Sequence, residues 1–194
     1  MNAFAAIDDV ALVGLIAGHP LAWIVARAAP EAAAPMPLVA ELDEHGAARS
    51  LLGHLPKRHP LVGHFARDPR GVFLFQGPHG YISPEALDDK DWAPTWNFAV
   101  ATIEADVVFD DALTDLALRT LVEHMERDRR APWQVAAMGE RYAALSENVI
   151  GFRATISASR ARFKLGQDES EPVFEQIVAA QGDSELGQWM QAWR

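Results

Sequence analysis

The stretch that decides the fold is GVFLFQGPHGYISPEALDDKDWAPTWNF, residues 71–98. Its first part, Val72–Phe75, is a β-branched and aromatic run that stops at Gly77-Pro78, which predicts a buried strand closed by a tight turn. Many aromatic and polar side chains then gather within a short distance: Gln76, His79, Tyr81, Ser83, Trp92, Thr95, Trp96 and Asn97. Such a concentration of aromatic area indicates a core or a flat ligand that receives it. The alternative is a rigid surface loop pinned by its own aromatic side chains.

The residues before this stretch predict one helix and three strands. Asp8 is placed to cap a helix that ends near Gly18. Strands are expected at Leu21–Arg27, Pro35–Leu42 and Ala48–Leu55, with Ala28–Ala34 as an exposed hairpin connection. Three consecutive strands joined by short turns predict an antiparallel meander.

The residues after it continue the pattern. Thr95–Phe109 reads as one long strand, and Asp110 or Asp111 is expected to cap an amphipathic helix that runs to about Arg127. The inward face of that helix is predicted to hold Leu113, Leu116, Ala117, Thr120, Leu121, His124 and Met125. The remaining expected elements are a short helix from Pro60, a helix at 140–147, a last strand pair at 149–165 and terminal helices at 171–181 and 184–193. Strands without regular β-α alternation favour a small antiparallel barrel with peripheral helices.

Composition narrows the classes of function. The chain has 194 residues, of which 49% are hydrophobic, and no window is apolar enough to span a membrane. Acidic residues near the start and the absence of cysteine favour a cytoplasmic protein. A formal net charge of −10 makes direct DNA binding doubtful, because phosphate contacts need a basic surface.

One basic turn could hold an anion. GHLPKRHP, residues 53–60, places His54, Lys57 and Arg58 between a strand end and a helix start, where free N–H groups attract a phosphate. The alternative is a solvated basic turn. If a phosphate binds here, Lys57 is the expected cation, and Lys164 is the next candidate.

Metal and catalytic patterns are weak. The spacing of His54, His59 and His64 would not converge on one ion from a helix, so no metal site is expected. Ser83 and His79 could form a nucleophile and base, but no oxyanion motif surrounds them, and the catalytic residues stay unknown. No dinucleotide or P-loop fingerprint occurs in the sequence.

Several motifs taken together resemble the PaiB-like family, the FMN-binding negative transcriptional regulators of bacteria. They are GHLPKRHP, FQGPHGYISP, APTWNF, Pro132-Trp133, NVIGFRATI and KLGQD, in matching order over about residues 12–181. The resemblance implies an antiparallel split β-barrel similar to that of pyridoxamine phosphate oxidases, with FMN in clefts at a homodimer interface. We predict a split-barrel domain at residues 1–168 and a C-terminal helical tail at 169–194.

By motif match, the resemblance also implies a set of FMN contacts. These are His54, Lys57, Tyr81, Ser83, Trp96, Asn97, Lys164 and Gln167. The chain departs from the family pattern at Gly166 and Asp168, which replace Ser and Asn, at Phe98, which replaces Tyr, and at Leu87. These changes remove polar groups that could orient a flavin.

Three functions are therefore compared. The first is a flavin-binding regulator, the second a flavin-dependent oxidoreductase acting on a small substrate, and the third a dimeric interaction protein that has lost flavin. All three share a predicted homodimer, because the loops and the helical tail carry more apolar surface than one subunit should cover. The tail residues concerned are Phe174, Ile177, Val178, Leu186, Trp189 and Trp193.

Overall fold

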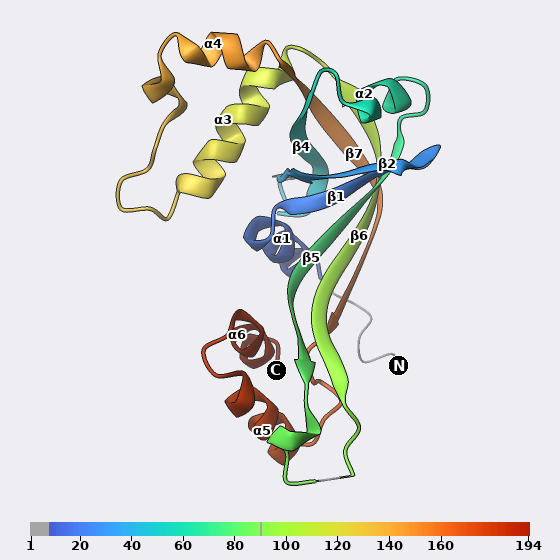
Figure 1. The fold of residues 1–194 in the computed structure, drawn as a ribbon, viewed down its shortest axis with the longest axis vertical. Helices are drawn as coiled ribbons and strands as arrows, with labels where there is room; N and C mark the ends of the chain where they lie inside the picture. Colours follow the sequence, from blue (N-terminus) through green and yellow to red (C-terminus); the bar gives the residue numbers. More distant parts are fainter. Residues whose placement is uncertain (1–7, 90) are drawn as a thin grey trace.

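The computed structural model describes residues 8–89 and 91–194 and contains one antiparallel sheet of seven strands (Figure 1). The strand order is β2-β1-β5-β6-β7-β4-β3. The strands are β1 (Leu21–Ala26), β2 (Ala29–Pro37), β3 (Val39–Leu42), β4 (Ala48–Pro56), β5 (Arg70–Ile82), β6 (Thr95–Phe109) and β7 (Val149–Lys164).

The sheet curls because its two edges are joined by a single residue. β2 and β3 lie at opposite edges of the sheet, yet only Leu38 separates them in the chain. Leu38 is fully buried, and its backbone N–H donates to the carbonyl of Pro20 (2.9 Å). Gly53 makes room for it, because a Cβ there would lie 2.5 Å from Leu38 Cδ2. The strands therefore wrap around one core, and the barrel architecture that the sequence predicts is confirmed.

The core follows the alternation of β6. Its odd-numbered residues, from Asn97 to Val107, are buried, while the even-numbered ones lie at least partly in solvent. The small side chains of Ala99, Ala101 and Ala105 on the inner face of β6 leave room for large side chains from other elements to pack in the core. Those large side chains include Phe73, Phe75, Phe152, Phe163, Leu15 and Ile16.

The helices of the barrel start where local signals predict. In α1 (Asp9–Gly18), the Asp8 carboxylate accepts from the N–H of Ala11, and in α2 (Pro60–Phe65), His59 Nδ1 accepts from the N–H of Leu61. The long helix α3 (Leu113–Glu126) lies over β4 and β7, where Thr114 Oγ1 accepts from the N–H of Gly151. A 3₁₀ turn, η2 (Val135–Met138), and α4 (Arg141–Ser146) follow it.

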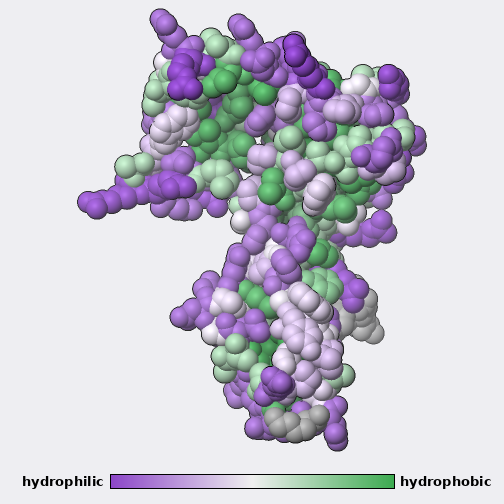
Figure 2. Space-filling model, viewed as in Figure 1, coloured by the Kyte–Doolittle hydropathy of each residue, from purple (hydrophilic) through white to green (hydrophobic). Residues whose placement is uncertain are grey.

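The far ends of β5, β6 and β7 extend beyond the barrel and carry a smaller lobe (Figures 1 and 2). This lobe contains η1 (Pro84–Ala86), α5 (Glu171–Gln181) and α6 (Glu185–Ala192). Phe163 of β7 contacts the rings of Trp189 and Trp193, and Met190 of α6 is completely buried. Within the described residues, no helix is long and apolar enough to cross a membrane.

Five sequence predictions about the strands and helices are wrong. Residues 28–34 are not an exposed connection, because most of them belong to β2, which pairs with β1 through Ala34 and Ala29. The expected meander does not form, since β1 pairs with β5 and β4 pairs with β7, so that the two N-terminal hairpins lie at opposite edges of the sheet. Gly77-Pro78 does not end a strand but makes a bulge in β5, and residues 149–165 form one long strand rather than a pair.

The fifth error concerns α3. Leu116 and Met125, predicted on the inward face, are 45% and 52% exposed, while Thr114, which is not among the predicted inward residues, is buried. The start of α3 packs on β7 at Gly151, and its last turn contacts α1, where His124 Nε2 lies 2.7 Å from the carbonyl of Ala17. Asp110 does accept from the N–H of Ala112 (2.8 Å), one residue before the helix.

The helical tail has less free apolar surface than predicted. Phe174, Ile177, Leu186 and Met190 belong to the same buried cluster as the barrel core. The exposed large apolar side chains lie mostly on the strands instead, among them Leu21, Trp23, Leu74, Tyr81 and Trp96. The division at residue 168 into a barrel and a tail stays a prediction.

Candidate functional site

The eight predicted site residues separate into two groups at opposite ends of β7. Pro56, next to Lys57, pairs with Val149 at the start of that strand, and Lys164 is its last residue. At about 3.3 Å per residue, sixteen residues of strand span roughly 50 Å. One mononucleotide cannot touch both groups within a single chain.

The first group is the basic turn of His54 and Lys57. The ammonium of Lys57 lies 2.9 Å from the carboxylate of Asp111, and the hollow that it lines also contains Asp115 and Glu147. The local field is therefore less positive than the sequence of the turn suggests. A bound phosphate would have to displace Asp111 from Lys57, which is feasible because both side chains are largely in solvent.

His54 is the partly buried member of this group. It pairs with Gly151, over which the start of α3 packs, and its Nδ1 is buried without a hydrogen-bond partner. Burial lowers the pKa of His54 below its ordinary value, so the neutral ring is favoured. A neutral imidazole with a free nitrogen can accept or donate one hydrogen bond to a ligand that reaches it.

Three members of the second group, Tyr81, Trp96 and Lys164, lie in a strip of aromatic and basic side chains. We call it the aromatic strip, and it consists of His79, Tyr81, Trp96, Phe98, Arg162 and Lys164. Trp96 is 54% exposed, stacks on His79 with ring centroids 6.4 Å apart and contacts the Tyr81 ring at 6.0 Å. Lys164 donates to Thr95 Oγ1 (2.7 Å) and to the carbonyl of Trp96 (3.4 Å). Flat apolar faces with a cation beside them suit a flat anionic ligand.

Register explains how the strip forms. Tyr81 pairs with Trp96 and His79 with Phe98 across β5 and β6, and Phe98 pairs with Lys164 across β6 and β7. The bulge at Gly77-Pro78 keeps His79 and Tyr81 on the same outer face as Gln76. Arg162 lies over the Phe98 ring at 5.6 Å.

The other predicted contacts have structural partners. The Asn97 side chain is buried and its amide donates to Met190 Sδ (3.6 Å). Gln167 braces the turn after β7, because it accepts from the N–H of Leu165 and donates to the carbonyl of Phe163. Ser83 accepts from the N–H of Glu85 and so caps η1. Among the described residues, no group of three His, Asp or Glu side chains could hold a metal ion.

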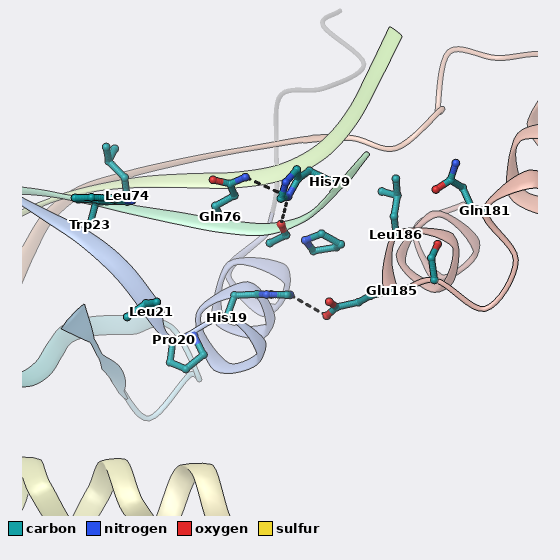
Figure 3. A pocket seen from close by; sticks show the side chains of 13 residues that line it. His19, Pro20, Leu21, Trp23, Leu74, Gln76, His79, Gln181, Glu185 and Leu186 are labelled. Carbon is teal, nitrogen blue, oxygen red and sulfur yellow. Dashed lines mark hydrogen bonds and ion pairs between the residues drawn. The ribbon is translucent and has the colours of Figure 1, made fainter. Parts of the chain in front are cut away.

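Sequence reasoning did not assign a role to Phe98 or Arg162, and it missed a cleft at the edge of β5. The alternation of β6 and β7 could have identified the first two, because they share the face of Trp96 and Lys164. The cleft has a volume of about 630 Å³ and lies between β1, the β5 bulge and α6 (Figure 3). Its walls come from β1, β5 and the α5–α6 region, and the last of these is more than a hundred residues from the two strands in the sequence, so no local pattern signals the cleft.

The structure is similar to solved flavoprotein folds. It matches a FAD and heme binding protein from Mycobacterium smegmatis with a TM-score of 0.58 and 16% identity, over 90% of this chain and 78% of that one. It matches the flavocytochrome Anf3 from Azotobacter vinelandii with a TM-score of 0.58 and 14% identity, over 83% and 69% of the two chains. At such low identity these matches establish the fold alone.

Sequence relatives agree with the motifs. The protease synthase and sporulation protein PAI 2 of Bacillus subtilis is 25% identical over 132 residues, 66% of this chain and 62% of that protein. An Aspergillus fumigatus protein is 26% identical over 158 residues, 61% of this chain and 60% of its own length. The chain thus spans about three fifths of the curated relatives it matches. Residues 1–158 match the model of the family described as "Putative FMN-binding domain", and the chain belongs to this family.

Proposed function

We propose that this protein binds FMN at sites shared between the two subunits of a homodimer, and that it is a regulator of the PaiB-like type. The main support for a shared site is the distance between the two predicted groups, which lie at opposite ends of β7. A two-fold axis across the strands would place the Lys57 turn of one subunit against the aromatic strip of its partner. Each dimer would then hold two equivalent sites.

The chemistry of the two half-sites is complementary for FMN. The exposed rings of Tyr81 and Trp96 offer a surface for the isoalloxazine. Lys57 and His54 from the partner would approach the phosphate end, and Lys164 is the alternative phosphate cation. When bound, the flavin would supply the redox chemistry, and the protein residues would bind and orient it.

The exposed apolar side chains support self-association. Tyr81 and Trp96 are each about half exposed, and Val108 near the other end of β6 is 61% exposed. A single subunit leaves these side chains in water, whereas an interface across the strands would bury them. Light scattering should return about twice the subunit mass of 21.3 kDa, and a monomer at micromolar concentration would contradict the proposal.

A mixed dimer tests the shared site directly. Lys57→Ala and Trp96→Ala each alter a different half-site, so each homodimer should lose FMN at both sites. A heterodimer of the two variants, purified through two different tags, contains one site built from two unaltered halves and should recover one FMN per dimer. Arg67→Ala, an exposed cation outside both groups, is the control. A heterodimer that stays empty would place the whole site within one chain.

Spectra separate the three functions. Bound FMN gives a visible absorbance band, and a purified protein that cannot be loaded to show this band would be the interaction protein without flavin. Bleaching of the band by a reduced nicotinamide would favour the oxidoreductase. A band that resists reduced nicotinamides supports the regulator, whose partner or DNA site the flavin would influence.

A further inference from the structure

The cleft at the edge of β5 has one apolar wall and one polar wall. Leu21, Trp23 and Leu74 form the apolar wall, where Trp23 and Leu74 are opposite each other across β1 and β5 and are 51% and 40% exposed. Gln181, Ser184 and Glu185, at the end of α5 and the start of α6, form the polar wall (Figure 3). His19 and Pro20 lie on a third side, and Gln76 and His79 on the fourth.

The charge of the cleft is negative. Glu185 is its carboxylate, and none of the described residues that line it is a lysine or arginine. His19 Nε2 lies 3.0 Å from Glu185 Oε1 without hydrogen-bond geometry, and the Glu185 side chain remains 57% exposed. Glu185 is in the first turn of α6, where the helix dipole favours an anion. The carboxylate therefore lies beside His19 while most of it stays accessible.

The His79 ring connects the cleft with the aromatic strip. It lines the cleft and also stacks on Trp96. Its Nδ1 lies 3.1 Å from Gln76 Nε2 and 3.2 Å from the carbonyl of Gly77, so the bulge fixes its position. The volume of about 630 Å³ is in the range of sites that take small molecules.

We propose that this cleft, which adjoins the aromatic strip at His79, binds a small organic ammonium ion with a flat apolar body. The apolar body would pack on Trp23 and Leu74, and the ammonium would pair with the Glu185 carboxylate on the opposite wall. A ligand with a carboxylate in place of the ammonium would be repelled by Glu185. The cleft should therefore bind cationic ligands more tightly than anionic ligands of the same shape.

A matched pair of probes tests this inference by calorimetric titration. We expect 2-phenylethylamine to bind roughly tenfold or more tightly than 3-phenylpropionate, which has a carboxylate in place of the ammonium. Glu185→Gln should reduce this preference to about twofold or less, and Trp23→Ala should weaken 2-phenylethylamine. Glu175→Gln, an exposed carboxylate of α5 outside the cleft, should leave the preference unchanged.

Several results would overturn the inference. Equal affinity for the two probes, a preference for 3-phenylpropionate, or an unchanged preference in Glu185→Gln would each do so. A lower mass of Glu185→Gln in light scattering would also overturn it, because the cleft would then be filled by a second copy of the chain. Unchanged circular dichroism of the variants excludes misfolding. The absorbance band of bound FMN, recorded on the same samples, tests the FMN proposal separately, so a failure of the cleft proposal can be told from a failure to bind FMN.

Discussion

The Lys57 ammonium and the Asp111 carboxylate lie 2.9 Å apart, so the cation predicted to bind a phosphate already has an anionic neighbour in its own chain. Their side chains are 44% and 74% exposed, and an exposed pair of this kind contributes about 1 kcal/mol or less. A dianionic phosphate can therefore compete with Asp111. Lys57 thus remains a candidate for the cation that binds the FMN phosphate, and it can be tested against Lys164.

Lys57→Ala should weaken FMN binding by about ten- to a hundredfold, because a charge-assisted bond to phosphate is worth roughly 1.5–3 kcal/mol. Riboflavin has no phosphate and should lose much less. Fluorescence titration of both ligands measures the difference. If Lys164→Ala weakens FMN but not riboflavin, the phosphate lies beside the aromatic strip. If each variant weakens FMN and riboflavin equally, neither lysine contacts the phosphate.

Asp111→Asn should strengthen FMN binding by roughly two- to fivefold, since the variant removes the carboxylate that competes for Lys57. The same titration should show no change for riboflavin. Asp128→Asn, at the other end of α3, serves as the control for a lost surface charge. An unchanged FMN affinity would mean that Lys57 does not contact the phosphate.

The protein should lose stability as the pH falls below about 6.5, in part through His54. Burial lowers the pKa of His54, so the unfolded chain takes up a proton that the folded chain resists, and protonation favours unfolding. The stabilising contribution is complete above the unfolded pKa and is lost as the pH falls toward the folded one. His54→Gln should show a smaller drop in the free energy of unfolding between pH 7.5 and 5.5 in urea titrations. An identical drop in both proteins would show that His54 is not protected from protonation.

Gly151→Ala should destabilise the fold by at least about 2 kcal/mol, because its new Cβ would lie 2.5 Å from the backbone carbon of Leu113. The start of α3 would have to move off β7. Gly14→Ala is the matched control, since nothing lies within 4 Å of the new Cβ and alanine favours the α1 helix by up to about 1 kcal/mol. Thermal denaturation should therefore move in opposite directions, and a mild Gly151→Ala variant would contradict the close packing of α3.

Direct DNA binding should be weak, and the distribution of charge gives the reason. Residues 83–94 and 165–194 carry ten acidic and two basic side chains, which accounts for most of the net charge of −10. The smaller lobe would repel a phosphate backbone. A mobility shift at nanomolar protein in physiological salt that survives competitor DNA would contradict this prediction.

The sequence by itself determined the local elements and the faces of the strands. Asp8 and His59 cap α1 and α2 with their own side chains, and β6 runs over the residues 95–109 that the alternation predicts. These features depend on neighbours within a few residues, so the sequence contains the whole interaction. The motifs also identified the family, which residues 1–158 match.

Only the tertiary structure decided how these elements combine. The pairing of β1 with β5 and of β4 with β7, the bulge at Gly77-Pro78 and the packing of the tail under β7 all depend on contacts between distant segments. Side chains from such segments can meet in many ways that satisfy the same alternation, and burial of the common core selects one of them. For that reason the sequence could name Lys57 and Trp96, but the length of β7 between them, and the cleft beside Trp23 and Glu185, emerged only from the fold.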